Sequence, residues 1–240
     1  MTSEKQQNTP SSDVKTEKSL LWELFFNLCM PIFILMKGHV LLPISPKISL
    51  LIAILCPFSY GLLDWIRESH FNWIALLGLI SIVVKGGVGV FEGSTQLLAI
   101  NEMLLPLIMG LVVLSFRLLK RPPLLQKILL NEQFCNTNLI LENLEKKKNE
   151  SRLWKRLRTY EWVLAGLFFF SAALNYILAR CVVVHPAGST EFNHELGVLT
   201  LWSFIIIAIP STLGLLGIVW RFFVKVKKYT GLTWEEILKN

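Results

Sequence analysis

The chain has 240 residues, a formal net charge of +7 and a mean hydropathy of +0.52. Hydrophobic residues make up 53% and charged residues only 17%, whereas soluble domains carry roughly 25% charged residues. Because the polar residues are gathered into the termini and one long segment, the composition excludes an ordinary soluble globular domain. It predicts an all-α, polytopic membrane protein.

Residues 1–18 are polar and rich in Ser and Thr, so we expect a disordered N-terminal tail. Residues 19–119 hold four apolar stretches and residues 159–226 hold two more, followed by a short tail at 227–240. Each stretch is long enough to cross about 30 Å of hydrocarbon as a helix. The six predicted spans are 19–36, 48–66, 71–91, 96–119, 160–184 and 197–224. The first lacks a small-residue cleavage site, which favours a retained span over a signal peptide.

Prolines fall inside four of these spans. A proline removes one helical hydrogen bond, and neighbouring helices can satisfy the freed carbonyl. We therefore predict helix kinks at Pro31, Pro57, Pro106 and Pro210.

The distribution of Lys and Arg predicts the orientation. If the N-terminus is cytoplasmic, all but four of the 24 Lys and Arg residues fall on the inner side; the exceptions are Lys37, Lys47, Lys85 and Arg180. Positive charge is concentrated in cytoplasmic loops of membrane proteins. The sequence thus predicts a six-helix bundle with both termini in the cytoplasm.

Residues 120–158 are predicted to be the main cytoplasmic element. Leu and Ile recur there at helical spacing, and Lys146–Lys148 and Arg152–Arg158 add positive charge. This pattern is typical of two short amphipathic helices lying on anionic lipid head groups. Nucleic-acid binding is the sharper alternative, but positive-inside charge already explains the cluster, so we expect no nucleic-acid partner.

Ionisable residues inside spans are costly and are the best functional leads. Glu23 and Asn27 share one face of the first span with Pro31, since they lie at four-residue spacing. Asp64 and Arg67 end the second span on the same side. We expect an inner polar cluster formed by Glu23, Asn27, Asp64 and Arg67.

A second polar cluster is expected nearer the outer face. Lys85 and Glu102 lie at similar depth in spans joined by a short turn, which predicts an ion pair within the membrane. Asn101, Asn175 and Arg180 fall at comparable depth. Glycines beside Lys85 would let another helix approach closely: Gly86, Gly87 and Gly89. Both clusters could clasp helices together or line a polar pathway.

A weak internal repeat pairs the first three spans with the last three. Asn27-xxx-Pro31 matches Glu102-xxx-Pro106, and Phe71-Asn72 matches Phe192-Asn193. Three spans per half would make the halves inverted, as in many secondary transporters. A 3+3 inverted repeat is therefore one interpretation of the order of these motifs.

The sequence shows no recognisable catalytic or metal-binding motif. We identify no phosphate-binding glycine loop, zinc motif or nucleophile elbow, and predict no enzyme, no cofactor and no metal. His185, Glu191, His194 and Glu195 share one loop, where a capped helix start, with Thr190 and Asn193 as caps, is favoured over a metal site. The four cysteines are interpreted as structural: Cys29, Cys56, Cys135 and Cys181.

Several short motifs together resemble a known family. They include Phe26-Asn27-xxx-Pro31, Tyr60-Gly61-xx-Asp64, Asn101-Glu102-xxx-Pro106, Leu174-Asn175-Tyr176, Phe192-Asn193-xx-Leu196-Gly197 and Thr230-Gly231-Leu232-Thr233. From about residue 20 onward the chain resembles uncharacterised bacterial multi-pass proteins related to intracellular septation protein A. The resemblance implies a bacterial inner-membrane protein that acts in envelope maintenance or division through partner proteins. It supplies no catalytic residues.

Two function classes remain open. One is a non-enzymatic inner-membrane protein that binds other membrane proteins or a second copy of itself. The other is a transporter of a small solute or ion that uses the two polar clusters. A membrane enzyme is a third class, but no sequence motif supports it.

Overall fold

The computed structural model describes residues 25–41, 44–67, 73–119, 122–132 and 135–238, and within these ranges the chain is all-α. The helices, with η marking π-helical turns, are η1 (Phe25–Cys29), α2 (Met30–Leu41), α3 (Pro46–Arg67), α4 (Trp73–Val90), α5 (Thr95–Leu118), α6 (Leu124–Leu129), α7 (Thr137–Lys146), α8 (Glu150–Val182), α9 (Thr190–Ser203), η2 (Phe204–Ala208), α10 (Ile209–Thr230) and α11 (Trp234–Ile237). A single isolated β-bridge joins Cys135 to Leu238 in this part of the chain. The predicted tail at 1–18 lies outside the described residues.

Three helices in the described ranges are long and apolar enough to cross a membrane. They are Thr95–Leu118, Glu150–Val182 and the continuous helix Thr190–Thr230 that α9, η2 and α10 form together. Their apolar side chains are largely exposed; Phe170 and Leu213, for example, are 64% and 63% exposed. Apolar surface of this extent is stable in lipid rather than in water.

The bounds of the helices agree with the predicted spans to different degrees. The helix formed by η1 and α2 ends at Leu41, five residues beyond the predicted end at 36. α5 agrees with 96–119 to within one residue at each end. α8 begins ten residues before the predicted start at 160, and the Thr190–Thr230 helix extends beyond 197–224 at both ends. Hydropathy detects only the apolar part of a helix, so the polar extensions were missed.

The chain divides into two compact units. The first comprises Met1–Thr95 and Val182–Thr200, and the second comprises Gln96–Cys181 and Leu201–Asn240. In the first unit, α2, α3, α4 and the start of α9 pack closely. Asn193 Nδ2 donates to Pro46 O at 2.7 Å, and Ser49 Oγ donates to Ile34 O at 3.1 Å.

Glycines permit this close packing. A Cβ on Gly89 would collide with Leu50, and one on Gly86 would approach Ile54 Cδ1 to 3.1 Å. The predicted close approach at these two glycines is thus confirmed, with α3 as the neighbour. Gly87 faces open space within 4 Å and does not take part.

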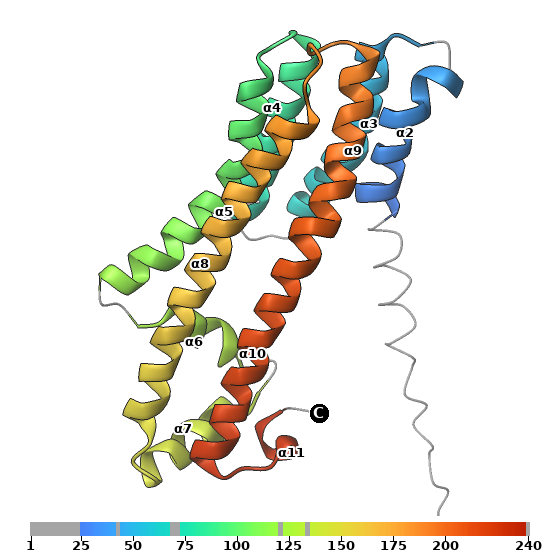
Figure 1. Cartoon of the computed structure of the whole chain (residues 1–240). Coiled ribbons are helices and arrows are strands. Elements are labelled where there is room, and N and C mark those ends of the chain that lie inside the picture. The colour runs from blue at the N-terminus through green and yellow to red at the C-terminus, as the bar shows by residue number, and fades with distance from the viewer. Residues whose placement is uncertain (1–24, 42–43, 68–72, 120–121, 133–134, 239–240) are drawn as a thin grey trace, which may run out of the picture. The chain divides into compact units, whose positions relative to one another are not determined.

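In the second unit, α8 and α10 run side by side, and α7 and α11 lie at their shared end (Figure 1). The hydroxyls of Ser171 and Ser211 are 2.8 Å apart and join the two long helices. Further along, α6, α7, the start of α8, the end of α10 and α11 enclose a hydrophobic core. We call this bundle the helical head. Its fully buried members are Cys135, Ile140, Leu144, Leu153, Leu157, Phe222, Val226 and Ile237.

Candidate functional site

The predicted inner cluster cannot be assembled from the described residues. Glu23 lies outside them, and the side chains of Asn27, Asp64 and Arg67 are likewise outside what the structure describes. The backbone places Asn27 in η1 and the other two in the last turns of α3. This cluster therefore stays a prediction.

The members of the predicted outer cluster belong to two different units. Lys85 is half-buried in α4 of the first unit, and Asn101 (5% exposed) and Glu102 lie in α5 of the second. The Lys85–Glu102 ion pair stays a prediction. In α8, Asn175 Nδ2 donates to Ser171 O of the same helix at 2.9 Å, and Arg180 is exposed.

The four prolines occupy two kinds of position. Pro57 and Pro106 lie inside continuous α-helices. Pro31 and Pro210 are each the second residue after a π-helical turn, η1 and η2 respectively. A π turn accommodates the hydrogen bond that proline removes. These two turns lie in the predicted first and sixth spans, which the predicted repeat does not pair.

The loop between α8 and α9 is built around Glu195. Its Oε2 accepts the backbone N–H groups of Val184 and His185 at 3.0 Å, and its Oε1 lies 2.6 Å from His185 Nδ1. This hydrogen bond raises the pKa of His185. Glu195 therefore holds the loop as a hydrogen-bond acceptor; no group of three or more His, Cys, Asp or Glu side chains that could hold a metal occurs among the described residues.

The cap of α9 differs from the predicted one. Ser189 Oγ accepts the Phe192 N–H at 3.1 Å, so Ser189 is the capping residue. Thr190 donates instead to Glu191, and Asn193 donates to Pro46 O. The predicted pair was wrong because the helix begins at Thr190, one residue after its cap.

The segment 120–158 forms two short helices, α6 and α7, and the start of α8. The sequence predicted that two amphipathic helices here lie on lipid, but their apolar faces have a different neighbour. The apolar faces of α6 and α7 pack inside the helical head through Leu125, Leu129, Ile140 and Leu144. They contact protein, so these faces do not lie on lipid. The charged side chains of the same segment remain at the surface.

The C-terminal residues of the described chain pack against the start of α7 and complete the helical head. Gly231 ends α10 in a left-handed conformation (φ 74°), and Thr233 begins α11 with a capping box to Glu236. Asn136 at the start of α7 binds this end twice, through its N–H to Ile237 O at 2.9 Å and its Nδ2 to Glu236 O at 2.8 Å. The Thr230–Thr233 motif is thus a helix stop and restart.

Glu161 is a buried polar residue that the sequence interpretation missed. It is 2% exposed in α8, and its Oε1 accepts the Leu124 N–H at the first residue of α6 at 2.5 Å. The signal was available, because Glu161 is an isolated carboxylate just inside a predicted span. It anchors the head to the long helix.

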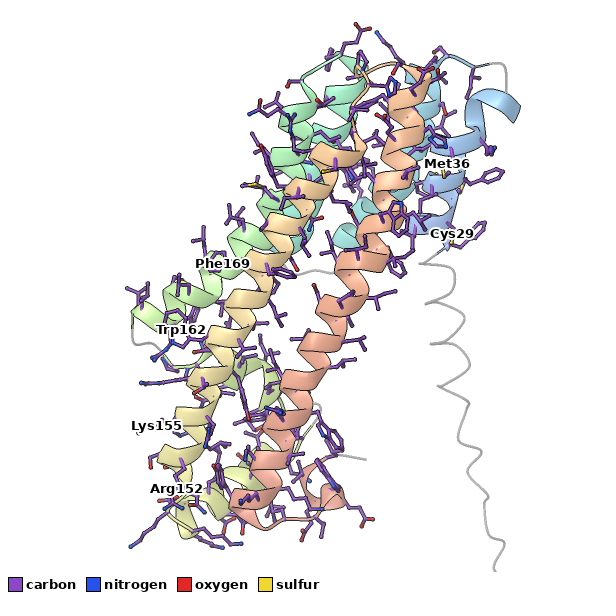
Figure 2. The ribbon with its side chains drawn as sticks, viewed as in Figure 1. Cys29, Met36, Arg152, Lys155, Trp162 and Phe169 are labelled. Atoms are coloured by element: carbon purple, nitrogen blue, oxygen red, sulfur yellow. The ribbon has the colours of Figure 1, made fainter. Side chains whose placement is uncertain are left out.

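Basic side chains gather on two surfaces of the second unit. Arg152, Lys155 and Arg158 surround a hollow of about 430 Å³ beside Trp154. A larger groove of about 610 Å³ lies between α8 and α10, with Arg156, Arg221 and Lys225 among its lining residues. Arg152 and Lys155 lie at the head end of α8, and Trp162 and Phe169 follow further along (Figure 2). These surfaces are the most distinctive chemical feature of the unit.

Comparison with protein-family models, with curated proteins and with solved structures found no match. The class of protein therefore rests on the structure itself. The chain is an all-α protein, within the described ranges, with three helices able to cross a membrane and a helical head with basic surfaces.

Proposed function

We propose that this chain is a non-enzymatic, six-span protein of the bacterial inner membrane, with both termini in the cytoplasm, that supports cell-envelope or septation processes by binding membrane partners. The observation that carries this proposal is the helical head. A folded extramembrane element on a membrane anchor offers a surface for a protein partner.

The lengths of the helices support an extramembrane head. α8 has 33 residues and is about 50 Å long, which exceeds the roughly 30 Å of hydrocarbon. Its apolar part lies beyond Tyr160, and its first turns carry Arg152, Lys155 and Arg158. Because basic residues favour the cytoplasmic side, the head belongs there.

The partner surface is proposed to be the basic hollow of α8. Arg152, Lys155 and Arg158 are exposed around the half-buried Trp154. Trp and Arg are enriched at the centres of protein interfaces, and the positive charge suits an acidic partner. The septation role itself rests on the motif resemblance described above.

Co-purification tests the proposal. The full chain, cross-linked in membranes, should carry a reproducible division or envelope-synthesis protein, and R152E/K155E/R158E should lose it. Lys127→Glu, at an exposed head position outside the hollow, is the single-site control. No reproducible partner, or equal loss in the control, would contradict the proposal.

Transport is the second candidate, and the ionisable residues of α4 and α5 favour it. Lys85 is half-buried within an apolar helix, and Asn101 is buried beside Glu102. Such residues commonly line solute pathways. Solute flux into liposomes should then fall in Glu102→Gln and persist in Glu150→Gln, whose side chain is exposed in the head. If no solute moves and Glu102→Gln alters only stability, the transport function fails.

A further inference from the structure

The groove between α8 and α10 combines positive charge with apolar walls. Its lining residues are Arg156, Thr159, Tyr160, Val163, Trp220, Arg221, Val224 and Lys225. Three of the eight are cations and none is a carboxylate. Its volume of about 610 Å³ lies within the range of small-molecule sites, roughly 300–1,000 Å³.

The lining of the groove changes from positively charged at the head end to apolar at the other end. α8 enters its apolar part after Tyr160, whereas α10 leaves its apolar part before Arg221, and the two helices run side by side. Arg156 and Lys225 therefore lie at the head end. Val163 and Trp220 lie toward the apolar end, so the groove has a cationic mouth and an apolar continuation.

Two glycines extend this apolar end. Gly166 lies three residues beyond Val163, and Gly217 lies three residues before Trp220, so each continues the lining face of its helix. Both are exposed, and a Cβ at either would meet nothing within 4 Å. At Gly166 and Gly217, just beyond the residues that line the groove, no side chain therefore fills the space beside either helix.

The indole of Trp220 is held in place at the groove. It stacks on Trp234 of α11 with ring centroids 5.5 Å apart and an interplanar angle of 17°. Lys227 Nζ lies 5.2 Å from the centroid of the Trp234 ring and makes a cation–π contact with it. Trp220 remains 64% exposed, as is typical of a tryptophan at a membrane interface.

The cations at the mouth are available to a ligand. Within the described ranges, none of Arg156, Arg221 and Lys225 forms an ion pair. The nearest carboxylate along α8, Glu161, is buried and accepts the N–H of Leu124. Arg and Lys side chains suit a phosphate group, which accepts several hydrogen bonds at once.

We propose that this groove binds one anionic phospholipid. Its phosphate is held by Arg156, Arg221 and Lys225, and an acyl chain passes Val163 and Trp220 toward Gly166 and Gly217. Basic pockets between membrane helices on the cytoplasmic side bind such head groups. The proposal requires only that α8 and α10 reach a bilayer surface, and it does not depend on the identity of a protein partner.

Lipid binding to the delipidated full chain in neutral detergent tests this site by native mass spectrometry. Phosphatidylglycerol is the probe, phosphatidylcholine tests the need for net charge, and inorganic phosphate tests a site for the free ion. R156Q/R221Q/K225Q removes the mouth, and R152Q/K155Q/R158Q removes the same number and kinds of charge from the separate hollow. Gly217→Leu fills the apolar end, and Thr212→Leu adds bulk at an exposed position on the opposite face.

The wild type should bind one phosphatidylglycerol in preference to phosphatidylcholine, and inorganic phosphate should not displace it. The mouth variant should weaken binding about tenfold or more, and the hollow variant by less than about threefold. Gly217→Leu should also weaken binding, and Thr212→Leu should not. Equal losses in the two charge variants, displacement by inorganic phosphate, or unchanged binding in Gly217→Leu would each overturn the site. Retained binding in the hollow variant together with loss of the protein partner would separate this site from the proposed partner surface.

Discussion

The carboxylate of Glu161, in the first half of α8, accepts the backbone N–H of Leu124, the first residue of α6. The two residues are 37 positions apart in the chain. This one hydrogen bond joins the long apolar helix to the first helix of the head, and it satisfies an N-terminal donor that has no partner within α6.

Removing this acceptor should destabilise the head. Glu161→Ala leaves the partly buried Leu124 N–H without its side-chain acceptor, at a cost of about 1 kcal/mol. Glu161→Gln keeps a side-chain oxygen and should cost less. Thermal unfolding in detergent measures both, with Glu145→Ala at an exposed position as control. An unfolding temperature unchanged in Glu161→Ala would show that the hydrogen bond does not hold the head.

Neighbouring glycines of α4 should respond in opposite directions to alanine. Gly87→Ala meets open space and should be neutral or stabilising by up to about 1 kcal/mol, because alanine favours helix. Gly89→Ala places a methyl group against the buried Leu50 and Phe192 and should destabilise by about 1–3 kcal/mol. Denaturant titration of the two variants side by side measures the difference. Equal stabilities would mean that α3 and α4 do not pack as described.

The His185–Glu195 contact should depend on pH. The hydrogen bond raises the pKa of His185 above its ordinary value of 6.5. The extra stability that the charged imidazolium gives this contact is therefore fully present below about pH 6.5 and is lost as the pH rises through the raised value. An NMR titration of the His185 ring should show the raised pKa, and Glu195→Gln should return it toward 6.5. The same pKa in both proteins would exclude the contact.

The thiol of Cys135 should report on the folding of the head. Cys135 is 0% exposed and lies within the core, whereas Cys181 is exposed in α8. In single-cysteine variants, a soluble maleimide should label Cys135 only after denaturation, because the reagent cannot reach a buried thiolate. Rapid labelling of Cys135 in the native protein would mean that the head is open.

Sequence patterns located the helices well because membrane-length apolar runs are strong local signals. The match of α5 to 96–119 follows from composition alone. The head could be predicted only in part. Spacing identified the apolar faces of α6 and α7, but what covers them is decided by residues such as Phe222 and Ile237, about a hundred positions away. Lipid was the expected neighbour, and protein is the observed one.

The polar residues were harder to predict for the same reason. Glu161 contacts Leu124, 37 positions away in the chain, and a local sequence pattern cannot predict such a contact. The groove likewise combines Arg156 with Arg221 and Lys225, which meet only because α8 and α10 lie side by side. Residue type marks a candidate, and tertiary packing decides its neighbours.

The central claim, a membrane anchor with its helical head in the cytoplasm, is tested most directly by cysteine accessibility. In a chain without its native cysteines, Glu145→Cys marks the head and Pro186→Cys marks the α8–α9 loop; both positions are exposed. A membrane-impermeant thiol reagent applied to spheroplasts should label the cysteine at 186, and should label the one at 145 only after the membrane is permeabilised. Labelling of position 145 in intact spheroplasts, or protection of 186 until permeabilisation, would contradict the account.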